Sequence, residues 1–584
     1  MENNVIKYNE NITKGKKYFS EEKFDIALEY FKKAIQNNPD LKEPYLLEAM
    51  SYQFIEERSS KNAQSALYRI LAIDPDDSIA PKCLEKVISR ELLSQSICLY
   101  PICYESTDKD KKYTIYEDEF IVNFIDDVTM KFRILDDNCV SIVSCDYDKK
   151  HIGVRIGLKL EKSIGERSVT IPSSIIFQNR EYAITEIGRM AFRGEDSNNL
   201  PRFLTSIVIP NTIKVIAEDA FQCCSFLKTI IIPTSVETIG VGAFSYCTNL
   251  EKIVVKKGNP KYDSRNNCNA IIESKTNSII VGCKTTQIPR TVTRIGFAAF
   301  AGQRLLKSIE IPNTITDIEV SAFQGSGLRD VLIPDSVINV GKVAFHACHL
   351  HSVQLGDSLS TIGASAFCDN PELIAIFVPK SVKSIGERAF NSASLGNGGW
   401  VQSYRVHSDN PYYDSRNNCN AIIETKTDTL VFGCNSTLIP DTIKHIGDNA
   451  FSLCKSISEI SLPDSIETIG NGVFWGCENL CNVTLPESII KLGASVFAAC
   501  EKLREIIIPQ NVTYIGESIF VGCKNIKSII SLNTRPPYLQ SDYLFSKYDK
   551  SYYSLVTLYV PKKAIENYKN APGWKLFKTI LVVE

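Results

Sequence analysis

A period of 23 residues runs through most of this 584-residue chain and limits what it can fold into more than any other feature. From Leu462 the sequence reads LPDSIETIGNGVFWGCENLCNVT, then LPESIIKLGASVFAACEKLREII, then IPQNVTYIGESIFVGCKNIKSII. A unit this short cannot bury an apolar face alone, so the copies are expected to stack as coils of a leucine-rich-repeat solenoid. One copy has Gly356 where the others have a proline, and those prolines are Pro210, Pro233, Pro289, Pro312, Pro334, Pro379, Pro440, Pro463, Pro486 and Pro509.

Each copy predicts one short strand and one return segment. In the segment LKTIII the residues alternate, so Ile230 and Ile232 are expected to point into the core while Thr229 and Ile231 face outward. The proline then ends the strand, because it cannot donate to a parallel ladder. A glycine such as Gly240 permits a bend that a Cβ would resist. The A-F-x-x-C segment brings the chain back and supplies a ring and a sulfur to the interior.

The phenylalanine and cysteine of the return segment recur at one place in successive copies, which predicts two buried ladders. Neighbouring rungs lie about 4.8 Å apart, beyond the usual disulfide Cβ separation of about 3.5–4.5 Å. We therefore expect free thiols; disulfides, zinc and an aromatic ligand box are the alternatives, and no CxxC pair occurs among the 19 cysteines. The ladder residues are Phe221, Phe244, Phe300, Phe323, Phe345, Phe367, Phe390, Phe451, Phe474, Phe497, Phe520, Cys224, Cys247, Cys454, Cys477, Cys500 and Cys523.

The unit I-P-x-S-V-x-x-I-G-x-x-A-F-x-x-C-x-x-L resembles the BspA-type leucine-rich repeats of bacterial surface proteins, over about residues 120–584. The stretches 169–174 and 182–188 resemble the entry to such arrays, where strands cover the first coil. The stretch 558–568, followed by Gly573 and Trp574, resembles their closing segment. The resemblance implies a capped solenoid, since terminal repeats need a polar outer face.

Two nearly identical passages widen the repeat. NPKYDSRNNCNAIIESKTNSIIVGC begins at Asn259, and NPYYDSRNNCNAIIETKTDTLVFGC begins at Asn410, which is 151 residues later. Each contains two β-branched or apolar runs around a Lys-Thr-Asn or Lys-Thr-Asp turn, and this pattern predicts a hairpin. A duplication of several coils explains the likeness. The inserts are either binding elements or wide coils of the scaffold.

The N-terminal part follows a different pattern. Gly15, Tyr18, Ala27, Phe31 and Ala34, closed by a proline at position 39, resemble the tetratricopeptide repeat, with small residues where two helices approach. A looser second unit runs through Tyr52, Ala63, Leu67 and Ile70 to Pro75, and a further helix is expected over about residues 79–96. Repeats of this kind commonly bind peptides or helices in a groove.

These patterns predict an α+β repeat protein, in which N-terminal α-helical hairpin repeats precede a leucine-rich-repeat solenoid with short parallel strands and two β-hairpin-like inserts. The predicted segments are 1–96 for the helical repeats, 97–119 for a linker, 120–203 for an N-terminal β cap and first coil, 204–535 for the repeats with inserts near 256–286 and 407–437, and 536–584 for a C-terminal cap.

Composition argues against several classes of protein. The net charge is −2 with acids and bases interspersed, so no basic face for nucleic acid is expected. The N-terminal residues lack an apolar signal core, and no apolar run approaches the roughly 18 residues that span a bilayer. Free thiols favour a reducing compartment. We expect a cytoplasmic protein without a membrane span; the alternative is a cell-surface protein exported by a non-classical route.

Candidate catalytic groups are few. Three of the six histidines stand in the motif HACHLH, and imidazole and thiolate are both zinc ligands. Aligned on the repeat, Cys348 belongs to the buried ladder, His346 and His349 lie on the return side, and His351 precedes a strand, so they are not expected to converge. The pair Asp126–Asp127 stands in a turn-like polar stretch, and no GxSxG, P-loop or HExxH motif occurs. We therefore expect no enzyme activity, no cofactor and no metal.

A curved solenoid offers an extended concave surface, so the outward strand positions are the predicted binding face. We expect a protein or peptide partner there, in the groove of the helical repeats, or in both. The alternatives are a BspA-type surface adhesin and an enzyme without a recognisable motif. The predicted face consists of Val208, Thr229, Ile231, Lys252, Val254, Glu310, Asp330, Leu332, Phe377, Glu459, Glu505, Ile507 and Ile530.

Overall fold

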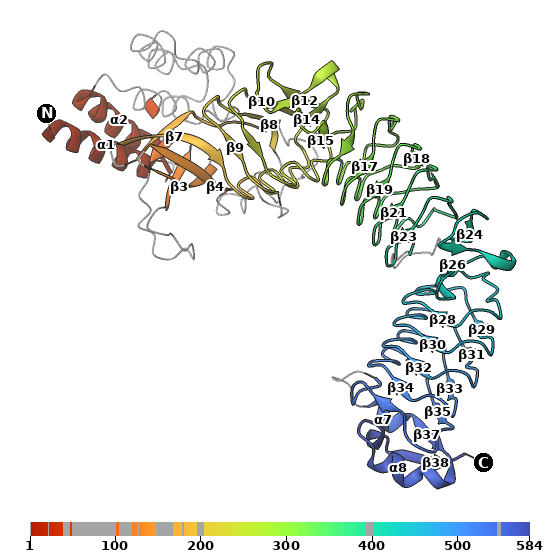
Figure 1. Ribbon diagram of the computed structural model, residues 1–584. Helices are drawn as coiled ribbons and strands as arrows, with labels where there is room; N and C mark the ends of the chain where they lie inside the picture. Colours follow the sequence, from red (N-terminus) through yellow and green to blue (C-terminus); the bar gives the residue numbers. More distant parts are fainter. Residues whose placement is uncertain are drawn as a thin grey trace. The chain divides into compact units, whose positions relative to one another are not determined.

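The computed structural model describes residues 2–20, 23–38, 47–48, 101–103, 119–124, 128–136, 138–147, 167–177, 180–194, 204–391, 401–545 and 551–583. The chain divides into two compact units, residues 1–261 and 262–584. Figure 1 labels the helices and strands of both units. The division falls inside the first duplicated passage. The predicted segment boundaries follow changes of sequence pattern and stay predictions.

Two helices open the first unit, α1 (Glu2–Ser20) and α2 (Phe24–Asn37). They share a small core in which Phe31 is fully buried. A Cβ on Gly15 would lie 2.5 Å from the Phe31 ring, so the helices approach at the small residue as predicted. The second helical unit, Tyr52 to Pro75, and the helix over residues 79–96 lie outside the described residues. The tetratricopeptide assignment therefore stays a prediction.

A β cap joins the helical part to the solenoid. Four antiparallel strands pair in chain order, and the fourth then pairs in parallel with β7 (Arg180–Ile187), which starts the ladder of coils. β6 (Ser174–Phe177) lies antiparallel on β7. The first strand falls within the stretch predicted as a linker. The four antiparallel strands are β1 (Pro101–Cys103), β2 (Glu119–Phe124), β3 (Val128–Ile134) and β4 (Cys139–Tyr147).

Most coils contribute to two sets of parallel strands, but residues 306–311 form no strand. The two-residue strands come from the T-I-G part of the repeat and pair from coil to coil. In the first unit they are β9 (Val215–Ile216) and β11 (Thr238–Ile239). In the second unit they are β16 (Arg294–Ile295), β17 (Asp317–Ile318), β19 (Asn339–Val340), β21 (Thr361–Ile362), β23 (Ser384–Ile385), β28 (His445–Ile446), β30 (Thr468–Ile469), β32 (Lys491–Leu492), β34 (Tyr514–Ile515) and β36 (Tyr538–Leu539).

The second set of strands lies on another side of the coils, and most of its members are the strands predicted before a proline. We call all of its members the long strands. They also pair in parallel, for example Ile230 with Ile253. In the first unit the long strands are β5 (Arg167–Thr170), β8 (Leu204–Val208), β10 (Thr229–Ile232) and β12 (Lys252–Val255). In the second they are β18 (Asp330–Leu332), β20 (Ser352–Gln354), β22 (Ala375–Val378), β24 (Ser403–Val406), β29 (Glu459–Ser461), β31 (Asn482–Thr484), β33 (Glu505–Ile508), β35 (Ser528–Ser531), β37 (Thr557–Val560) and β38 (Thr579–Val582).

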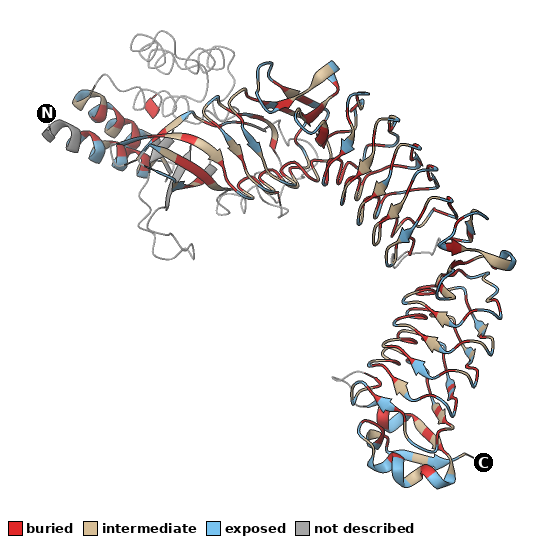
Figure 2. Ribbon diagram, in the orientation of Figure 1, coloured by how far each residue is buried: buried red, intermediate tan, exposed pale blue. Residues whose placement is uncertain are grey.

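The core is the pair of ladders that the spacing predicts. Buried residues line the inside of the coils, and exposed residues gather on strand faces and turns (Figure 2). Phe323 and Phe345 stack with ring centroids 5.0 Å apart, and Phe497 and Phe520 with centroids 6.1 Å apart. Phe192, which the prediction omitted, is the first ring of the column and stacks on Phe221.

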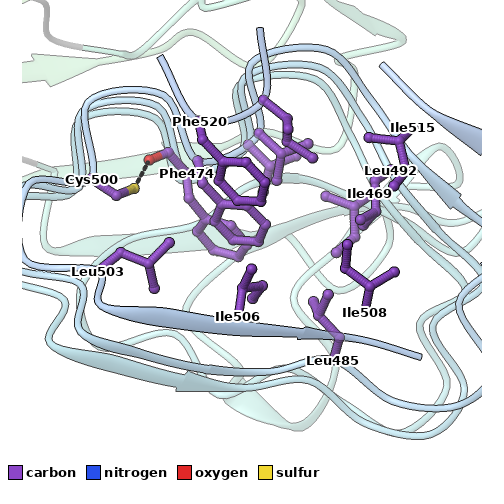
Figure 3. Packing of buried hydrophobic residues seen from close by; sticks show 14 of the residues in the cluster. Ile469, Phe474, Leu485, Leu492, Cys500, Leu503, Ile506, Ile508, Ile515 and Phe520 are labelled. Carbon is purple, nitrogen blue, oxygen red and sulfur yellow. Dashed lines mark hydrogen bonds between the residues drawn. The ribbon is translucent and has the colours of Figure 1, made fainter. Parts of the chain in front are cut away.

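The ladder cysteines are free, as predicted. Five of the six ladder thiols, all but that of Cys454, donate to the backbone carbonyl of the phenylalanine in the preceding coil. Cys500 Sγ lies 3.1 Å from Phe474 O (Figure 3), and Cys523 Sγ lies 3.0 Å from Phe497 O. Burial raises the pKa of Cys523 to about 12. A small side chain that can donate one weak hydrogen bond satisfies this interior position, and the protonated thiol is a poor nucleophile.

The repeat needs glycine at this position for a different reason from the one expected. Gly240 does not adopt a positive φ, but a Cβ on it would lie 2.3 Å from the backbone nitrogen of Glu218 in the preceding coil. The residue is therefore needed for close contact between coils. The left-handed turns occur two positions later, at residues such as Ala298 (φ 50°) and Val343 (φ 50°), which carry no sequence signal for that conformation.

Both inserts contain the predicted hairpin. The last strand of each insert also pairs in parallel with a short strand, so each insert starts a ladder of the second unit. The strands of the first are β13 (Tyr262–Asp263), β14 (Ala270–Glu273) and β15 (Ser278–Gly282). The strands of the second are β25 (Tyr413–Asp414), β26 (Ile422–Glu424) and β27 (Thr429–Phe432).

The C-terminal segment closes the core of the second unit. Between β37 and β38 the chain forms helix α8 (Ile565–Asn570), and α7 (Tyr552–Leu555) precedes β37. Tyr568 and Trp574 are buried, and Trp574 Nε1 donates to Pro537 O at 2.9 Å. No helix within the described residues is both long and apolar enough to cross a membrane.

Candidate binding face on the long strands

The outward positions of the long strands are where the alternation places them. Within the predicted set, Val208, Ile231, Leu332, Phe377 and Ile507 are apolar and exposed. The half-buried members are Thr229, Val254 and Ile530, and the exposed charged members are Lys252, Glu310, Asp330, Glu459 and Glu505. Glu310 lies outside the assigned strands. The residues of the predicted face are thus exposed or half-buried, and its role in binding stays a prediction.

The parallel register gathers some of these residues and separates others. In the first unit Ile231 pairs with Val254, and the pairing of Thr229 with Ser206 puts Val208 beside Ile231. In the second unit Ile507 pairs with Ile530. Leu332 instead lies opposite Gln354, and Phe377 opposite Arg405. The predicted apolar stripe is therefore broken into short groups.

The acids of the face are held by hydroxyl groups in the next coil. Ser352 Oγ donates to Asp330 Oδ1 at 2.6 Å, and Ser528 Oγ donates to Glu505 Oε2 at 2.5 Å. Both pairs follow the register of the strands. These carboxylates thus have partners within the ladder, so they contribute more to coil pairing than to an exposed charged site.

A hollow of about 530 Å³ opens on the face formed by β20, β22 and β24. Phe377 and Ile374 line it with apolar surface, and their side chains are 51% and 55% exposed. Arg405 lines it with a cation that forms no ion pair within the described residues. The complete lining is His351, Ser352, Val353, Ile374, Ala375, Ile376, Phe377, Ser403 and Arg405.

The second insert helps to form this hollow. Asn420 Oδ1 accepts a hydrogen bond from the backbone of Tyr404 at 2.8 Å, and Asn420 Nδ2 donates to Gln402 O at 2.8 Å. These bonds fix β24, which carries Arg405. The sequence-based prediction missed Arg405, because residues 401–406 were not recognised as a strand. It also missed Ile374, which lies directly before β22 and outside the strand alternation. The alternation Ser403-Tyr404-Arg405-Val406 was the signal that could have found β24.

The HACHLH motif behaves as expected in two respects. Cys348 is buried in the ladder, with its thiol 3.1 Å from Phe323 O, and burial raises its pKa to about 11. His351 forms an ion pair with Glu372, away from His346. His346 Nε2 lies 3.1 Å from Asp369 Oδ2, and hydrogen bonds to Asp369 and Cys368 raise the pKa of His346 to about 9. The three histidines do not converge, as predicted.

Known proteins match the chain mainly through its repeats. The pattern of the BspA type leucine rich repeat region matches in six copies, over residues 171–292, 271–396 and 432–547, which is more than half of the chain. No curated protein matches it.

Several solved bacterial structures are similar at low identity. A leucine rich cell surface protein from Faecalibacterium prausnitzii is 21% identical over 78% of this chain and 93% of its own, with a TM-score of 0.39. The pneumococcal vaccine antigen PcpA is 17% identical over 80% and 98%, with a TM-score of 0.40. A leucine-rich repeat protein from Bacteroides ovatus is 21% identical over 79% and 99%, with a TM-score of 0.33.

Proposed function

The chain belongs to the BspA-type leucine-rich repeat family, and from that premise we propose that it is a non-enzymatic protein that binds a protein partner. The partner is held on the long-strand face of the second unit, at the hollow between β20, β22 and β24. The observation that carries the proposal is the meeting of Phe377, Ile374 and Arg405 at this hollow.

The apolar groups of the hollow favour association. Phe377 and Ile374 belong to one coil, and both side chains are exposed at the hollow. Exposed apolar groups that cluster on one face mark interaction surfaces. Because their strands are fixed by neighbouring coils, binding orders few additional residues, and that lowers its entropic cost.

Arg405 gives the hollow a chemical preference. Arginine and aromatic residues are enriched among the few side chains that dominate interface energies. Arg405 lies opposite Phe377 in the register, and it has no carboxylate partner among the described residues. A partner that presents a carboxylate beside an apolar side chain satisfies both groups. The nearby acids Asp330 and Glu372 are already occupied by Ser352 and His351.

Affinity capture with the full chain tests this proposal, followed by binding measurements with the purified partner. The variant with Ile374→Asp and Phe377→Asp is expected to lose at least about 100-fold in affinity, since two contact groups of about 1.5–3 kcal/mol each become charged. The variant with Ile231→Asp and Val254→Asp places the same chemistry on the first unit and is the matched control. Loss of binding in the control alone would move the site to the first unit, and unchanged binding in both would overturn the proposal.

The location of the protein is a separate part of the proposal. The ladder thiols are free and buried, which suits a reducing compartment, so we place the protein in the cytoplasm. A surface adhesin of BspA type, exported by a non-classical route, is the second candidate and rests on the family. Fractionation of the native cells, with protease treatment of intact cells, separates the two. Protein that is cleaved from intact cells would contradict a cytoplasmic location.

A further inference from the structure

A group of potential metal ligands lies on the return side of two neighbouring coils in the second unit. His346 comes from the coil of Phe345, and Cys368 and Asp369 come from the coil of Phe367. One ligand atom from each of the three lies within 4.8 Å of the other two. No other group of three or more histidine, cysteine or acidic side chains in the described part of the chain meets this condition.

The backbone holds these residues in place. Ala347 N donates to Cys368 O at 2.9 Å, and Asp369 N donates to Asn391 O at 3.0 Å, so each return turn is locked to the next coil. Asp369 occupies a left-handed conformation with φ 58°, which aspartate tolerates better than most residues. The ligand positions are therefore set by the ladder of coils and not by a mobile loop.

The residue types differ from those that other coils place here. His346 and Cys368 each follow the ladder phenylalanine directly. In the other coils this position varies, and none of them carries a histidine, a cysteine or an acid there: the residues are Arg193, Gln222, Ser245, Ala301, Gln324, Asn391, Ser452, Trp475, Ala498 and Val521. An imidazole and a thiol in successive coils of one column, with a carboxylate beside them, are not required by the scaffold.

The geometry points to a divalent zinc-type metal site formed by His346, Cys368 and Asp369, and we propose that the protein binds one such ion there. Imidazole nitrogen, thiolate and carboxylate are the three ligand types that zinc takes. Ligand atoms on one tetrahedral zinc lie about 3.3 Å apart, given bonds of about 2.0–2.1 Å. His346 Nε2 and Asp369 Oδ2 are 3.1 Å apart, and Cys368 Sγ lies within 4.8 Å of a ligand atom of each.

The direction of His346 Nε2 and the exposure of the site fit this role. His346 Nδ1 is buried without a hydrogen-bond partner in the described residues, while Nε2 faces the carboxylate. The His346 and Asp369 side chains are 26% and 20% exposed, so an ion can enter from solvent and keep a water as its fourth ligand. An ion held this way links the coils of Phe345 and Phe367.

Cobalt(II) titration of the reduced, full-length protein tests the proposal, because a cobalt–thiolate bond gives a charge-transfer absorption that other ligands do not. One equivalent of Co²⁺ is expected to produce this band, and zinc is expected to displace the cobalt and raise the Tm. Cys368→Ser is expected to abolish the band. His346→Gln and Asp369→Asn are expected to weaken binding at least about tenfold.

Two control variants keep the test specific. His349→Gln removes a neighbouring imidazole of the same motif, and Cys481→Ser removes a partly exposed thiol elsewhere in the unit. Neither is expected to change the band, and circular dichroism checks that every variant is folded. Absence of the band in the wild-type protein, or a band that survives Cys368→Ser, would overturn the proposal.

Discussion

The two duplicated inserts show how one sequence pattern builds the same wide coil in two places. In each, an aspartate and an arginine two residues later form a bidentate pair: Arg265 Nη2 lies 2.6 Å from Asp263 Oδ2, and Arg416 Nη2 lies 2.6 Å from Asp414 Oδ2. The anchoring asparagine is also shared, since Asn410 Nδ2 donates to Pro379 O at 2.8 Å as its counterpart does to Pro233 O.

The arginine contacts of the two inserts differ in one charge, and the inserts also differ in what they support. Arg265 Nη1 donates to the neutral side chain of Asn277 at 2.9 Å, whereas Arg416 Nη1 pairs with the carboxylate of Asp428 at 2.8 Å. Both of these partners are supplied by the hairpin turn. The second insert also fixes β24, which carries Arg405 of the proposed binding hollow, through Asn420. The shared residues therefore serve the coil, and the difference lies in charge and in the attached strand.

Breaking a contact that both inserts share is expected to give the largest effect. A Cβ on Gly282 would lie 2.1 Å from the Phe300 ring, and one on Gly433 would lie 2.2 Å from the Phe451 ring. Gly282→Ala and Gly433→Ala should each lower the free energy of unfolding by about 3 kcal/mol, because a locked ring must move. Urea denaturation measures the loss. Gly447→Ala, whose Cβ would have 3.3 Å to its nearest neighbour, is the control and should cost clearly less.

Removing the arginine separates the two inserts. Arg416→Gln leaves two half-buried carboxylates without their cation and should cost about 1–2 kcal/mol of stability, whereas Arg265→Gln leaves one and should cost about 1 kcal/mol. The order of the two losses in urea denaturation is the test. Equal losses would show that Asp428 contributes nothing to the second clamp.

Acid should weaken both clamps. Partial burial acts to raise the pKa of Asp263 and of Asp414, but hydrogen bonds from the neighbouring arginine outweigh it, and each pKa lies below its ordinary value of 3.8. A lowered carboxyl pKa contributes stability that is present above pH 3.8 and is lost as the pH falls through the folded-state pKa. Asp414→Asn lacks this contribution, so its stability should fall less than that of the wild type between pH 5 and pH 3. An identical loss of stability in the wild type and in Asp414→Asn would show that ionised Asp414 does not stabilise the insert.

Exchanging the one charge is expected to give the smallest effect. Asn277→Asp should stabilise the first insert and Asp428→Asn should destabilise the second, each by about 0.2–1 kcal/mol, as for other partly exposed ion pairs. Because salt screens such pairs, both changes should shrink at 1 M NaCl. The double exchange should restore the wild-type free energy of unfolding to within about 0.5 kcal/mol, because residues 277 and 428 belong to different coils and share no partner. A larger difference in the free energy of unfolding between the double exchange and the wild type would mean that the two inserts are energetically coupled.

Much of the fold could be predicted because the same residue types recur at the same positions in every copy of the repeat. The spacing of Phe474, Phe497 and Phe520 identifies one interior column, and the period-two pattern around Ile230 identifies which face of the strand is buried. Free thiols followed from the same regularity. The hairpins followed from turn residues between apolar runs, which depend on local geometry alone.

The site was less predictable because it depends on residues from different coils. The outward direction of Phe377 follows from local alternation, but its neighbour Arg405 comes from a strand after an irregular stretch, and only the parallel register pairs them. Likewise His346 was compared with Cys348 in its own coil, while the structure brings it to Asp369 in the next. Aligning the copies on the phenylalanine column would have placed His346 directly beside Cys368.

The sequence by itself determined that the chain winds into stacked coils, which side chains enter them, and that their sulfurs stay reduced, because these depend on residue type and on a period that repeats. Tertiary structure alone decided which outward groups meet, where the sheet face becomes hollow, and why Gly240 must lack a Cβ. Those outcomes depend on contacts between coils, and the length of each coil and the docking of each insert set these contacts.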